Sequence, residues 1–600
     1  MREHHGPGEV EVDADTTLVA RLLADADADP SREAVAVRSG AGFRSWDLGE
    51  FARQIRLTAR GLVGAGVQPG QSVAIMASTR VEWSIIDYAI WAIGAVTVPV
   101  HETFTPQRAA SILDDSAAVA VVFGSEELAA AFSDDADRPS ACKHVFVLES
   151  DGLAQLQAHG DGIDEDAVSD RLDGLRMEQT ATIVYTSGTT GPPKGCVWTH
   201  GNLTWTVEQS IATVDEVIDP GRTTLLFLPL AHAFARLIQL AALRTGVVIA
   251  YSAGPDELEE ELVRFRPDFF LAVPRVFEKL FAHAEQEAHA GGALRGRLFD
   301  RAVAVAEARS REDATGSARL STRIRHTVFD RLVYRRIRDV LGGRVTHAIV
   351  GGDAFDERLG HVFIGLGITI LEGYGQTETT GPAALNRLAA LRIGTVGPPL
   401  PGVTIRIADD DEILVRGRNV FQGYHGKDEQ TREVLSADGW LATGDLGELD
   451  EDGFLRYVGR KKEMIVTSTG ENIVPADLED QLRAHPLIGH PVAVGDGRPF
   501  VGMLLSLDHD ELATWAGERG RSTDDPQQLT QDEQLRAELR SAIDEVNRTV
   551  SRPVERIGDF RIVPREFRID EGELTPTNKV KREVVEDRYQ DLIDDIYDDA

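Results

Sequence analysis

The sequence predicts an α/β fold with three parts: a large N-terminal α/β body, a β-rich subdomain and a smaller, mobile C-terminal α/β domain. In the first part, short β-branched runs such as Ser72–Met76 alternate with helical patterns such as Val81–Ile93. This alternation is typical of α/β proteins whose strands are buried and largely parallel. After about residue 395, alternating strands broken by Asp-Gly turns indicate antiparallel hairpins. Downstream of Arg460 an α/β pattern resumes.

These patterns place the elements in order along the chain. In the body we expect strands or helices at Ser72–Met76, Val81–Ile93, Val96–Val100, Pro106–Leu113, Ala118–Phe123, Val247–Tyr251, Phe269–Val273, Val345–Val350 and Ile368–Leu371. The hairpins fall in Gly402–Ile407, Glu412–Arg416 and Gly447–Val458, and the C-terminal elements at Ala476–Ala484, Val492–Val494, Val501–Leu507 and Gln531–Thr549. We therefore expect a disordered acidic N-terminus over residues 1–15, one domain over 16–459 and a second over 460–600.

Composition and charge exclude several classes of protein. The 600 residues carry a net charge of −35, which argues against nucleic acid as a main partner. The apolar run Tyr88–Val100 is too short to span a bilayer, which needs about twenty residues. The acidic N-terminus lacks the features of a targeting peptide, and two cysteines, Cys142 and Cys196, are too few for a disulfide framework or a thiolate metal cluster. We expect a cytoplasmic protein, and the sequence leaves its oligomeric state open.

One strand-to-loop segment has the composition of a phosphate-binding loop. It reads Ala181-Thr-Ile-Val-Tyr-Thr-Ser-Gly-Thr-Thr-Gly-Pro-Pro-Lys-Gly195. Glycines let backbone N–H groups approach phosphate oxygens, hydroxyls donate hydrogen bonds, and lysine supplies positive charge. The segment is not a Walker loop, because Pro193 stands where that motif requires glycine and Gly195 where it requires a hydroxyl. A flexible surface turn is the structural alternative.

Residues 185–195 resemble the phosphate loop of the adenylate-forming superfamily, which comprises acyl-CoA synthetases, peptide-synthetase adenylation domains and luciferases. Four further segments match that family in order: Gly373-Tyr-Gly-Gln-Thr-Glu378, Thr443-Gly-Asp445, Tyr457-Val-Gly-Arg-Lys-Lys-Glu463 and Pro576-Thr-Asn-Lys579. The resemblance covers about residues 16–585. It implies an N-terminal adenylation domain that binds ATP, Mg²⁺ and the acyl substrate, and a C-terminal domain that carries the catalytic lysine.

The resemblance also implies the roles of single residues. The ATP-binding residues are Thr186, Ser187, Gly188, Thr189, Thr190, Gly191, Lys194, Gly352, Tyr374, Gly375, Asp445 and Arg460. The catalytic residues are Thr377, Glu378 and Lys579, with Glu378 also the ligand of Mg²⁺; His232, Phe234, Gly351 and Gly373 border the acyl pocket. Lys462 is the hinge residue, and Gly470 lies beside the path of CoA.

The residue types of the nucleotide site suit these roles. A carboxylate such as Glu378, after a Gly-rich turn, offers Mg²⁺ one hard oxygen ligand. Tyr374 offers adenine a flat face. Asp445, in a tight turn, accepts two ribose hydroxyls, and Arg460 is close enough in the chain to donate to the same sugar. The structural alternatives are a solvated glutamate, a core tyrosine and an Asx-turn.

Lys579 lies in a Pro-containing loop, where a fixed cation would stabilise the charge that develops as pyrophosphate leaves. Its alternative is membership of a solvated basic run with Lys581 and Arg582.

The segment Leu228-Pro-Leu-Ala-His-Ala-Phe-Ala-Arg236 indicates the class of carboxylic acid. Peptide-synthetase adenylation domains anchor the substrate amine with an aspartate in this segment, but no acid occurs here. A buried ammonium without a partner is costly, so an amino acid substrate is disfavoured. The pattern resembles long-chain fatty acyl-CoA synthetases, whose His and aromatic residues border the acyl tunnel. A structural role for His232 is the alternative.

An arginine-rich island between Ala293 and Arg344 contrasts with the acidic remainder of the chain. Its thirteen Arg against six Asp and Glu give +7, which leaves −42 elsewhere in a chain of net −35. Apolar residues recur between the arginines of Leu320–Leu341 in an amphipathic pattern. Solvated helix faces are one interpretation. The other is attraction of acidic lipid, fatty acid or CoA phosphates, with peripheral association at the inner face of an anionic membrane.

The resemblance therefore predicts a ligase that converts fatty acid, ATP and CoA to acyl-CoA, AMP and diphosphate. No extra segment of the kind that fatty acyl-AMP ligases carry follows the 350s, which favours CoA over a carrier protein as acceptor. A luciferase-like oxidoreductase and an inactive ATP-binding regulator are alternatives from other classes. Frames for a serine hydrolase or a nucleotide dehydrogenase are not found in the chain.

Overall fold

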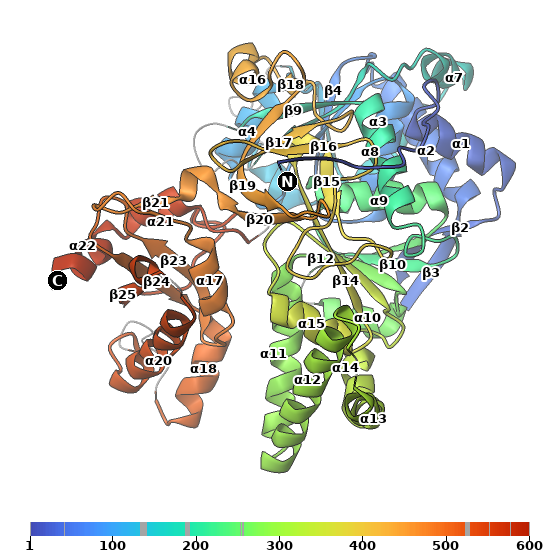
Figure 1. The fold of residues 1–600 in the computed structure, drawn as a ribbon. Coiled ribbons are helices and arrows are strands. Elements are labelled where there is room, and N and C mark those ends of the chain that lie inside the picture. Colours follow the sequence, from blue (N-terminus) through green and yellow to red (C-terminus); the bar gives the residue numbers. More distant parts are fainter. Residues whose placement is uncertain are drawn as a thin grey trace.

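The computed structural model describes residues 2–40, 42–132, 141–186, 193–252, 254, 257–317, 319–521, 529–550, 552–575 and 578–598. Figure 1 shows the C-terminal segment, in orange and red, as a separate lobe beside the N-terminal body. Hydrophobic core clusters built only from residues beyond 460 support this division of the chain. The expected large body and smaller C-terminal domain are confirmed.

A first mostly parallel sheet forms one layer of the body. Its strands, in spatial order, are β18 (Gly423–Tyr424), β9 (Gly195–Thr199), β8 (Thr180–Tyr185), β5 (Val96–Pro99), β4 (Ser72–Met76), β6 (Ala120–Phe123) and β7 (His144–Val147). Strands β5, β4, β6, β7 and β8 pair in parallel, as expected of buried β-branched runs that alternate with helices. The phosphate-loop segment connects the antiparallel pair β8 and β9.

A second mostly parallel sheet supplies the other wall of the body. Its order is β15 (Gly381–Leu385), β14 (Thr369–Gln376), β13 (His347–Val350), β12 (Phe269–Ala272), β10 (Thr223–Leu226), β11 (Val248–Tyr251), β2 (Glu33–Ser39) and β3 (Gly42–Asp47). The pairs from β14 to β2 are parallel, whereas β15 and β3 are antiparallel additions at the edges. Crossover helices connect the parallel strands, as that topology requires.

Several helices of the body begin at a side-chain cap. The helices of the body are α1 (Leu18–Ala28), α2 (Leu48–Gly64), α3 (Val81–Ala92), α4 (Pro106–Asp115), α5 (Glu126–Ala130), α6 (Gly152–Ala158), α7 (Asp166–Asp173), α8 (His200–Thr213), α9 (Ala233–Thr245), α10 (Leu258–Phe265), α15 (Glu357–Gly365) and α16 (Asp428–Val434). Thr199 and Asn202 form a capping box at the start of α8. Gly246 ends α9 with a φ of 86°, a left-handed conformation that glycine adopts readily.

The β-rich subdomain is a five-stranded antiparallel sheet, as the hairpin pattern predicts. Its order is β1 (Glu3–His5), β16 (Thr404–Ile407), β17 (Glu412–Arg416), β19 (Leu441–Leu449) and β20 (Leu455–Arg460). The expectation of a disordered N-terminus over residues 1–15 is wrong for its first strand, because β1 pairs with β16 and completes the sheet. Glu9 also accepts a hydrogen bond from the buried indole of Trp205 at 2.9 Å. Acidic composition did not indicate these long-range partners.

The C-terminal domain is built on small sheets covered by helices. A three-stranded sheet contains β23 (Ile488–Val494), β24 (Val501–Leu507) and β25 (Ile557–Ile562), and a short hairpin contains β21 (Ile465–Val466) and β22 (Asn472–Ile473). The helices are α17 (Ala476–Arg483), α18 (His509–Glu518), α20 (Glu533–Thr549), α21 (Arg582–Arg588) and α22 (Gln590–Asp598). The expected helices near 476 and 531 and the strand Val501–Leu507 are confirmed, whereas β25 was not predicted.

A helical projection extends from the body away from the sheets, in green in Figure 1. It comprises α11 (Pro274–Ala290), α12 (Ala293–Ala314), α13 (Leu320–Phe329), the π-helical turn η3 (Asp330–Tyr334) and α14 (Arg335–Val340). The arginine-rich island therefore folds into α12 to α14, together with the loop that ends at Arg344. Tyr334, Val333 and Ile337 are buried in the core of this projection.

A buried ion pair ties α9 to α3 in the centre of the body. The guanidinium of Arg236 donates to both carboxylate oxygens of Asp87, at 3.0 and 2.5 Å, and also to Thr182 at 2.8 Å. Arg236 lies 5.4 and 5.1 Å from the ring centres of Trp83 and Trp91. Arg236 is the last residue of the segment Leu228–Arg236, which resembles the segment that borders the acyl tunnel in long-chain synthetases. It packs in the core and does not line the cavity described below.

We expect Arg236→Ala to lower the free energy of unfolding by about 3–5 kcal/mol, because Asp87 would remain buried without a cation. Arg244→Ala is the matched control, since Arg244 pairs with Glu208 at 2.7 Å in a partly exposed setting. That change should cost about 1 kcal/mol or less. Denaturant titration of both variants measures the difference, and equal losses would contradict the assignment of Arg236 to the core.

Candidate functional site: a cleft between two domains

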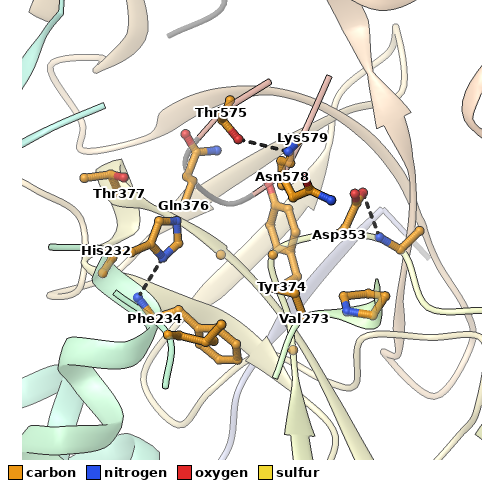
Figure 2. Close-up of a pocket in the computed structure, with 18 of the residues that line it drawn as sticks. His232, Phe234, Val273, Asp353, Tyr374, Gln376, Thr377, Thr575, Asn578 and Lys579 are labelled. Carbon is orange, nitrogen blue, oxygen red and sulfur yellow. Dashed lines mark hydrogen bonds between the residues drawn. The ribbon is translucent and has the colours of Figure 1, made fainter. Parts of the chain in front are cut away.

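A cavity of about 1240 Å³ lies between the body and the C-terminal domain. The body contributes the segments that follow β12, β13 and β14, where the carboxyl ends of parallel strands commonly form binding crevices. The C-terminal domain contributes α17 and the loop around Lys579. Figure 2 shows side chains from both domains directed into this space.

The described ends of the phosphate loop border the cavity. Thr186 and Lys194 both line it, and the Lys194 ammonium lies 5.0 Å from the ring centre of Tyr424. The predicted phosphate ligands Ser187, Gly188, Thr189, Thr190 and Gly191 lie outside the described residues. Lys194 thus brings one positive charge to the wall of the cavity.

The predicted Gly-rich turn before Glu378 is wrong, because residues 373–376 continue strand β14. This stretch pairs with β15 through a register shift between Tyr374 and Gly375. A Cβ atom on Gly375 would lie 1.9 Å from the Gly381 carbonyl oxygen, and one on Gly373 would lie 2.9 Å from Leu385. Gly375 is therefore required for close strand pairing, because its neighbour is backbone, whereas the Leu385 side chain next to Gly373 can move. The turn follows at η4 (Thr377–Thr379).

Asp445 is buried in strand β19 rather than in the tight turn that the sequence suggested. Its register partner in β20 is Arg460, whose Nε lies 3.0 Å from Asp445 Oδ1. The Tyr374 hydroxyl donates to Asp445 Oδ2 at 2.7 Å. Burial raises the pKa of the Asp445 carboxyl, whereas the Arg460 guanidinium favours its ionised form. Three predicted ATP-binding residues thus meet in one network, in which Tyr374 and Asp445 are buried and Arg460 is partly exposed.

The aromatic rings beside this network form a flat surface. Tyr374 and Tyr457 stack with ring centres 6.0 Å apart and an interplanar angle of 28°. Both tyrosines line the cavity, whereas Asp445 itself lies behind the lining. The arrangement suits a planar ring on the tyrosine face.

Glu378 lines the cavity on the side of the phosphate loop. Its Oε1 accepts a hydrogen bond from the Tyr424 hydroxyl at 2.8 Å, which leaves its second oxygen outside that bond. Thr377 lines the same wall, and its carbonyl accepts from the Trp198 indole at 2.8 Å. Tyr424 was not predicted, and its tie to Glu378 orients the carboxylate.

The predicted acyl-pocket residues lie together at the base of the cavity. A Cβ on Gly351 would lie 3.2 Å from the Phe234 ring and 3.3 Å from the Gly373 carbonyl oxygen, so a side chain there would fill the space. His232 caps α9, its Nδ1 accepting from the Phe234 N–H at 3.3 Å, as Figure 2 shows. Burial, with a smaller effect of Lys579, lowers the pKa of His232 to about 4, so the imidazole is neutral at pH 7.

An apolar branch of the cavity extends between α8 and α9, and the sequence analysis did not predict it. Apolar members of its wall come from both helices and the turn after α8: Val207, Val214, Ile218, Leu237, Ile238 and Ala241. Leu237, Ile238 and Ala241 lie one to four residues apart on α9, opposite Val207 of α8 and the turn residues Val214 and Ile218. A period of 3.6 within α8 and α9 was a detectable signal, but it cannot distinguish a cavity wall from a core face.

The loop of the C-terminal domain that carries Lys579 is closed by its own hydrogen bonds. The Thr575 N–H donates to the Lys579 carbonyl at 2.7 Å, and the Lys579 N–H donates to Thr575 Oγ1 at 3.0 Å. Lys579 and Asn578 line the cavity above Tyr374 in Figure 2. Lys581, which follows closely in the chain, does not line it.

Charged residues that the sequence analysis missed lie at the boundary between the two domains. Arg275, at the start of α11, lies 3.1 Å from Asp508 of the C-terminal domain. Asp480 and Arg483 of α17 also line the cavity, and burial raises the pKa of Asp480 to about 7, although Arg483 opposes that shift. The Arg275–Asp508 ion pair therefore joins the two domains in the arrangement that has Lys579 facing the body.

The predicted hinge residue lies where the two domains join. Lys462 is in the single helical turn η5 (Lys461–Glu463), between β20 and the short strand β21, and it lines the cavity. Gly470 instead lies in an exposed turn with a φ of 80° and does not line the cavity. The arrangement therefore brings Lys579 to the site and keeps Gly470 away from it.

Two family models match the chain. The model of the AMP-binding enzyme matches residues 23–425, and the model of the AMP-binding enzyme C-terminal domain matches residues 462–600. The chain belongs to the AMP-binding enzyme family. This membership confirms the adenylate-forming superfamily to which the motifs pointed.

Curated relatives extend over most of the chain. It is 44% identical over 555 residues to the long-chain-fatty-acid–CoA ligase FadD15 of Mycobacterium tuberculosis, covering 91% of each protein. It is also 28% identical to the long-chain-fatty-acid–CoA ligase ACSBG2 of Xenopus laevis, covering 94% of this chain and 82% of that protein.

Solved structures of AMP-binding enzymes share the fold. The fatty acyl CoA synthetase of Mycobacterium tuberculosis has a TM-score of 0.62 at 20% identity, covering 96% of this chain and 98% of that one. The A domain of the carboxylic acid reductase from Segniliparus rugosus, in complex with AMP and a co-purified carboxylic acid, has a TM-score of 0.74 at 20% identity, covering 98% and 94%.

Proposed function

We propose that the protein is an AMP-forming long-chain fatty acid–CoA ligase. The observation that carries this proposal is that one cavity combines Lys579, the Tyr374–Asp445–Arg460 network and an apolar branch. The identity of 44% to a long-chain-fatty-acid–CoA ligase supports the choice of acid and acceptor. The overall reaction converts fatty acid, ATP and CoA to acyl-CoA, AMP and diphosphate.

In the first half-reaction, a carboxylate oxygen of the fatty acid attacks the α-phosphorus of ATP. The bond to the β-phosphate oxygen breaks, and diphosphate leaves with its electron pair. Adenine would rest on the tyrosine face, and the phosphates would meet Lys194. The ribose hydroxyls would meet Arg460 at the cavity wall and the Asp445 carboxylate directly behind it. The Lys579 ammonium would stabilise negative charge on the α-phosphate and the carboxylate, which is most effective in a closed cleft.

Glu378 is the residue that would hold Mg²⁺. Tyr424 occupies only one oxygen of this carboxylate, so the other oxygen fits a hard cation that is also shared with substrate phosphates. When bound, Mg²⁺ supplies charge neutralisation on the diphosphate that leaves. The phosphate loop, from Ser187 to Gly191, would enclose the same oxygens.

The apolar branch and the acid-free segment around His232 favour a fatty acid over an amino acid. The neutral His232 offers no anion to a substrate ammonium, and the wall from Val207 to Ala241 is mostly apolar. Each buried methylene contributes about 0.8 kcal/mol, so affinity should increase with alkyl length.

In the second half-reaction, the CoA thiol loses its proton and its sulfur attacks the acyl carbonyl, whereupon AMP leaves. Lys579 has no use in this step, and Gly470 lies outside the cavity in the arrangement described. We propose that the C-terminal domain rotates about Lys462, which withdraws Lys579 and presents the Gly470 turn to the pantetheine path. A glycine there leaves room for the incoming chain.

ATP–diphosphate exchange with a panel of carboxylic acids, followed by addition of CoA, tests this proposal. We expect exchange with fatty acids, rates that rise with chain length, and release of AMP with acyl-CoA once CoA is added. Highest kcat/KM with acetate or an amino acid would contradict the fatty acid assignment. Exchange without thioester formation would instead favour a carrier protein as the acceptor. Light emission with oxygen would favour a luciferase-like oxidoreductase, and absence of exchange would favour an inactive ATP-binding regulator.

The helical projection supports a second proposal, peripheral association of this cytoplasmic enzyme with anionic membranes. Four of its apolar side chains, Leu320, Ile324, Val328 and Leu332, follow one another at intervals of four and are 51–73% exposed. Exposed arginines lie among them: Arg319, Arg323, Arg325, Arg331, Arg335 and Arg336. An amphipathic stripe with arginines beside it would lie in the membrane interface. In the described residues no helix is long and apolar enough to cross a bilayer.

We expect the double variant Leu320→Ser and Ile324→Ser to weaken binding to phosphatidylglycerol-containing vesicles several-fold at low salt, because it removes apolar area flanked by arginine. Val263→Ser is the matched control, since Val263 is 50% exposed on the acidic helix α10. Vesicle sedimentation measures both. No binding by the unmodified protein, or equal binding to phosphatidylcholine vesicles in high salt, would contradict the electrostatic account.

A further inference from the structure

The apolar branch between α8 and α9 ends against a second cavity, and one side chain contributes to the walls of both. We propose that this side chain, Ile218, sets the longest acyl chain that the enzyme accepts. The inference rests on the proposed function, because it takes the branch to be the acyl site. It goes beyond that function by assigning the end of the site to a residue.

The direction of the branch follows from the course of the chain. Helix α8 leads to the turn at Val214–Ile218, and β10 then returns the chain to the central cavity. Helix α9 runs from that cavity back toward the turn, which is the end of the branch farthest from Lys579. The Gly221 N–H donates to the Gly246 carbonyl at 3.0 Å, which fixes the ends of the two segments beside each other. From Phe234 to Ala241, α9 rises about 10 Å at 1.5 Å per residue, so the branch leads away from Lys579.

Ile218 is held rigidly at the end of this branch. Its N–H donates to the Val214 carbonyl at 3.0 Å in a turn that also buries Val217. The side chain of Ile218 is only 2% exposed, although it contributes to the lining of both cavities. It therefore acts as a partition between them.

The second cavity offers an acyl chain a different environment. It is a hollow of about 480 Å³ that opens to solvent, and it lies between α1 and the far ends of α8 and α9. Charged residues dominate its lining: Asp25, Asp29, Arg32, Asp215, Asp219 and Arg244. A terminal methyl group that passed Ile218 would enter a polar space and gain little from burial.

Two effects at Ile218 therefore limit the chain length. Within the branch, each added methylene should raise affinity about fourfold. Beyond it, a methylene must displace a rigid, buried side chain, which close-packed interiors resist. Activity should rise with chain length and then fall sharply at the length that reaches Ile218.

The test measures kcat/KM for a series of saturated fatty acids of increasing length with three proteins. Ile218→Ala removes three carbon atoms and joins the two cavities, so we expect the optimum to move two to three methylenes longer. Ile218→Trp extends into the branch and should move the optimum shorter. If Ile218→Ala is poorly folded in a thermal melt, Ile218→Val, which removes one carbon atom, should move the optimum in the same direction by about one methylene.

Ile211→Ala is the matched control, because Ile211 lines the second cavity and not the branch. Its chain-length profile should equal that of the unmodified enzyme. An unchanged optimum in both Ile218 variants, or an equal shift in Ile211→Ala, would overturn the inference.

Ile238→Trp distinguishes failure of this inference from failure of the proposed function, since Ile238 lines the branch itself. We expect it to abolish activity with long acids while short acids still support ATP–diphosphate exchange. If long acids remain good substrates of Ile238→Trp, the branch is not the acyl site and the present inference falls, whereas the proposed function stands. If the unmodified protein itself does not use long acids, the proposed function is wrong. If Ile238→Trp blocks them but the Ile218 variants keep the original optimum, only the present inference is wrong.

Discussion

The geometry of the cleft depends on the interactions of the buried Asp445 carboxylate with Tyr374 and Arg460. A carboxylate in this position requires partners, and it takes the Tyr374 hydroxyl at 2.7 Å and the Arg460 guanidinium at 3.0 Å. These three residues come from β14, β19 and β20, so one charge joins the second sheet to the β-rich subdomain. Because Arg460 ends β20 and Lys462 follows in the next turn, the same network fixes the point from which the C-terminal domain departs.

Much of the fold could be predicted because its strands are buried on both faces. Ser72–Met76 and Val501–Leu507 have the predicted bounds, and helix Val81–Ala92 differs by one residue. Prediction failed where long-range pairing decides the structure. Glu3–His5 is a strand because it pairs with β16, and residues 373–376 extend a strand because they pair with β15, whose backbone approaches Gly375 closely. Neither partner is visible in the local pattern.

The residues of the candidate site likewise fall into those that the sequence predicted and those that it did not. Sequence motifs predicted four of these residues: Tyr374, Asp445, Arg460 and Lys579. In the structure three of them line one cleft, and Asp445 lies directly behind Tyr374. Tyr424 and Asp480 carry no motif, since their importance arises from neighbours distant in the chain. The apolar branch could not be predicted, because the apolar residues of α8 and α9 that line it have the same spacing as residues that face a packed core. A cavity forms where side chains of neighbouring elements do not fill the space between them, and this packing is a property of the assembled fold.

The central claim is that the observed arrangement serves adenylation alone, with Lys579 supplied by a domain that must later move. The most direct measurement compares the two half-reactions in Lys579→Ala, with Lys581→Ala as the control because Lys581 does not line the cavity. We expect Lys579→Ala to slow acyl-AMP formation about 100-fold or more, while thioester formation from supplied acyl-AMP stays within a few-fold. Equal loss of both half-reactions, or an equal loss in Lys581→Ala, would contradict the claim.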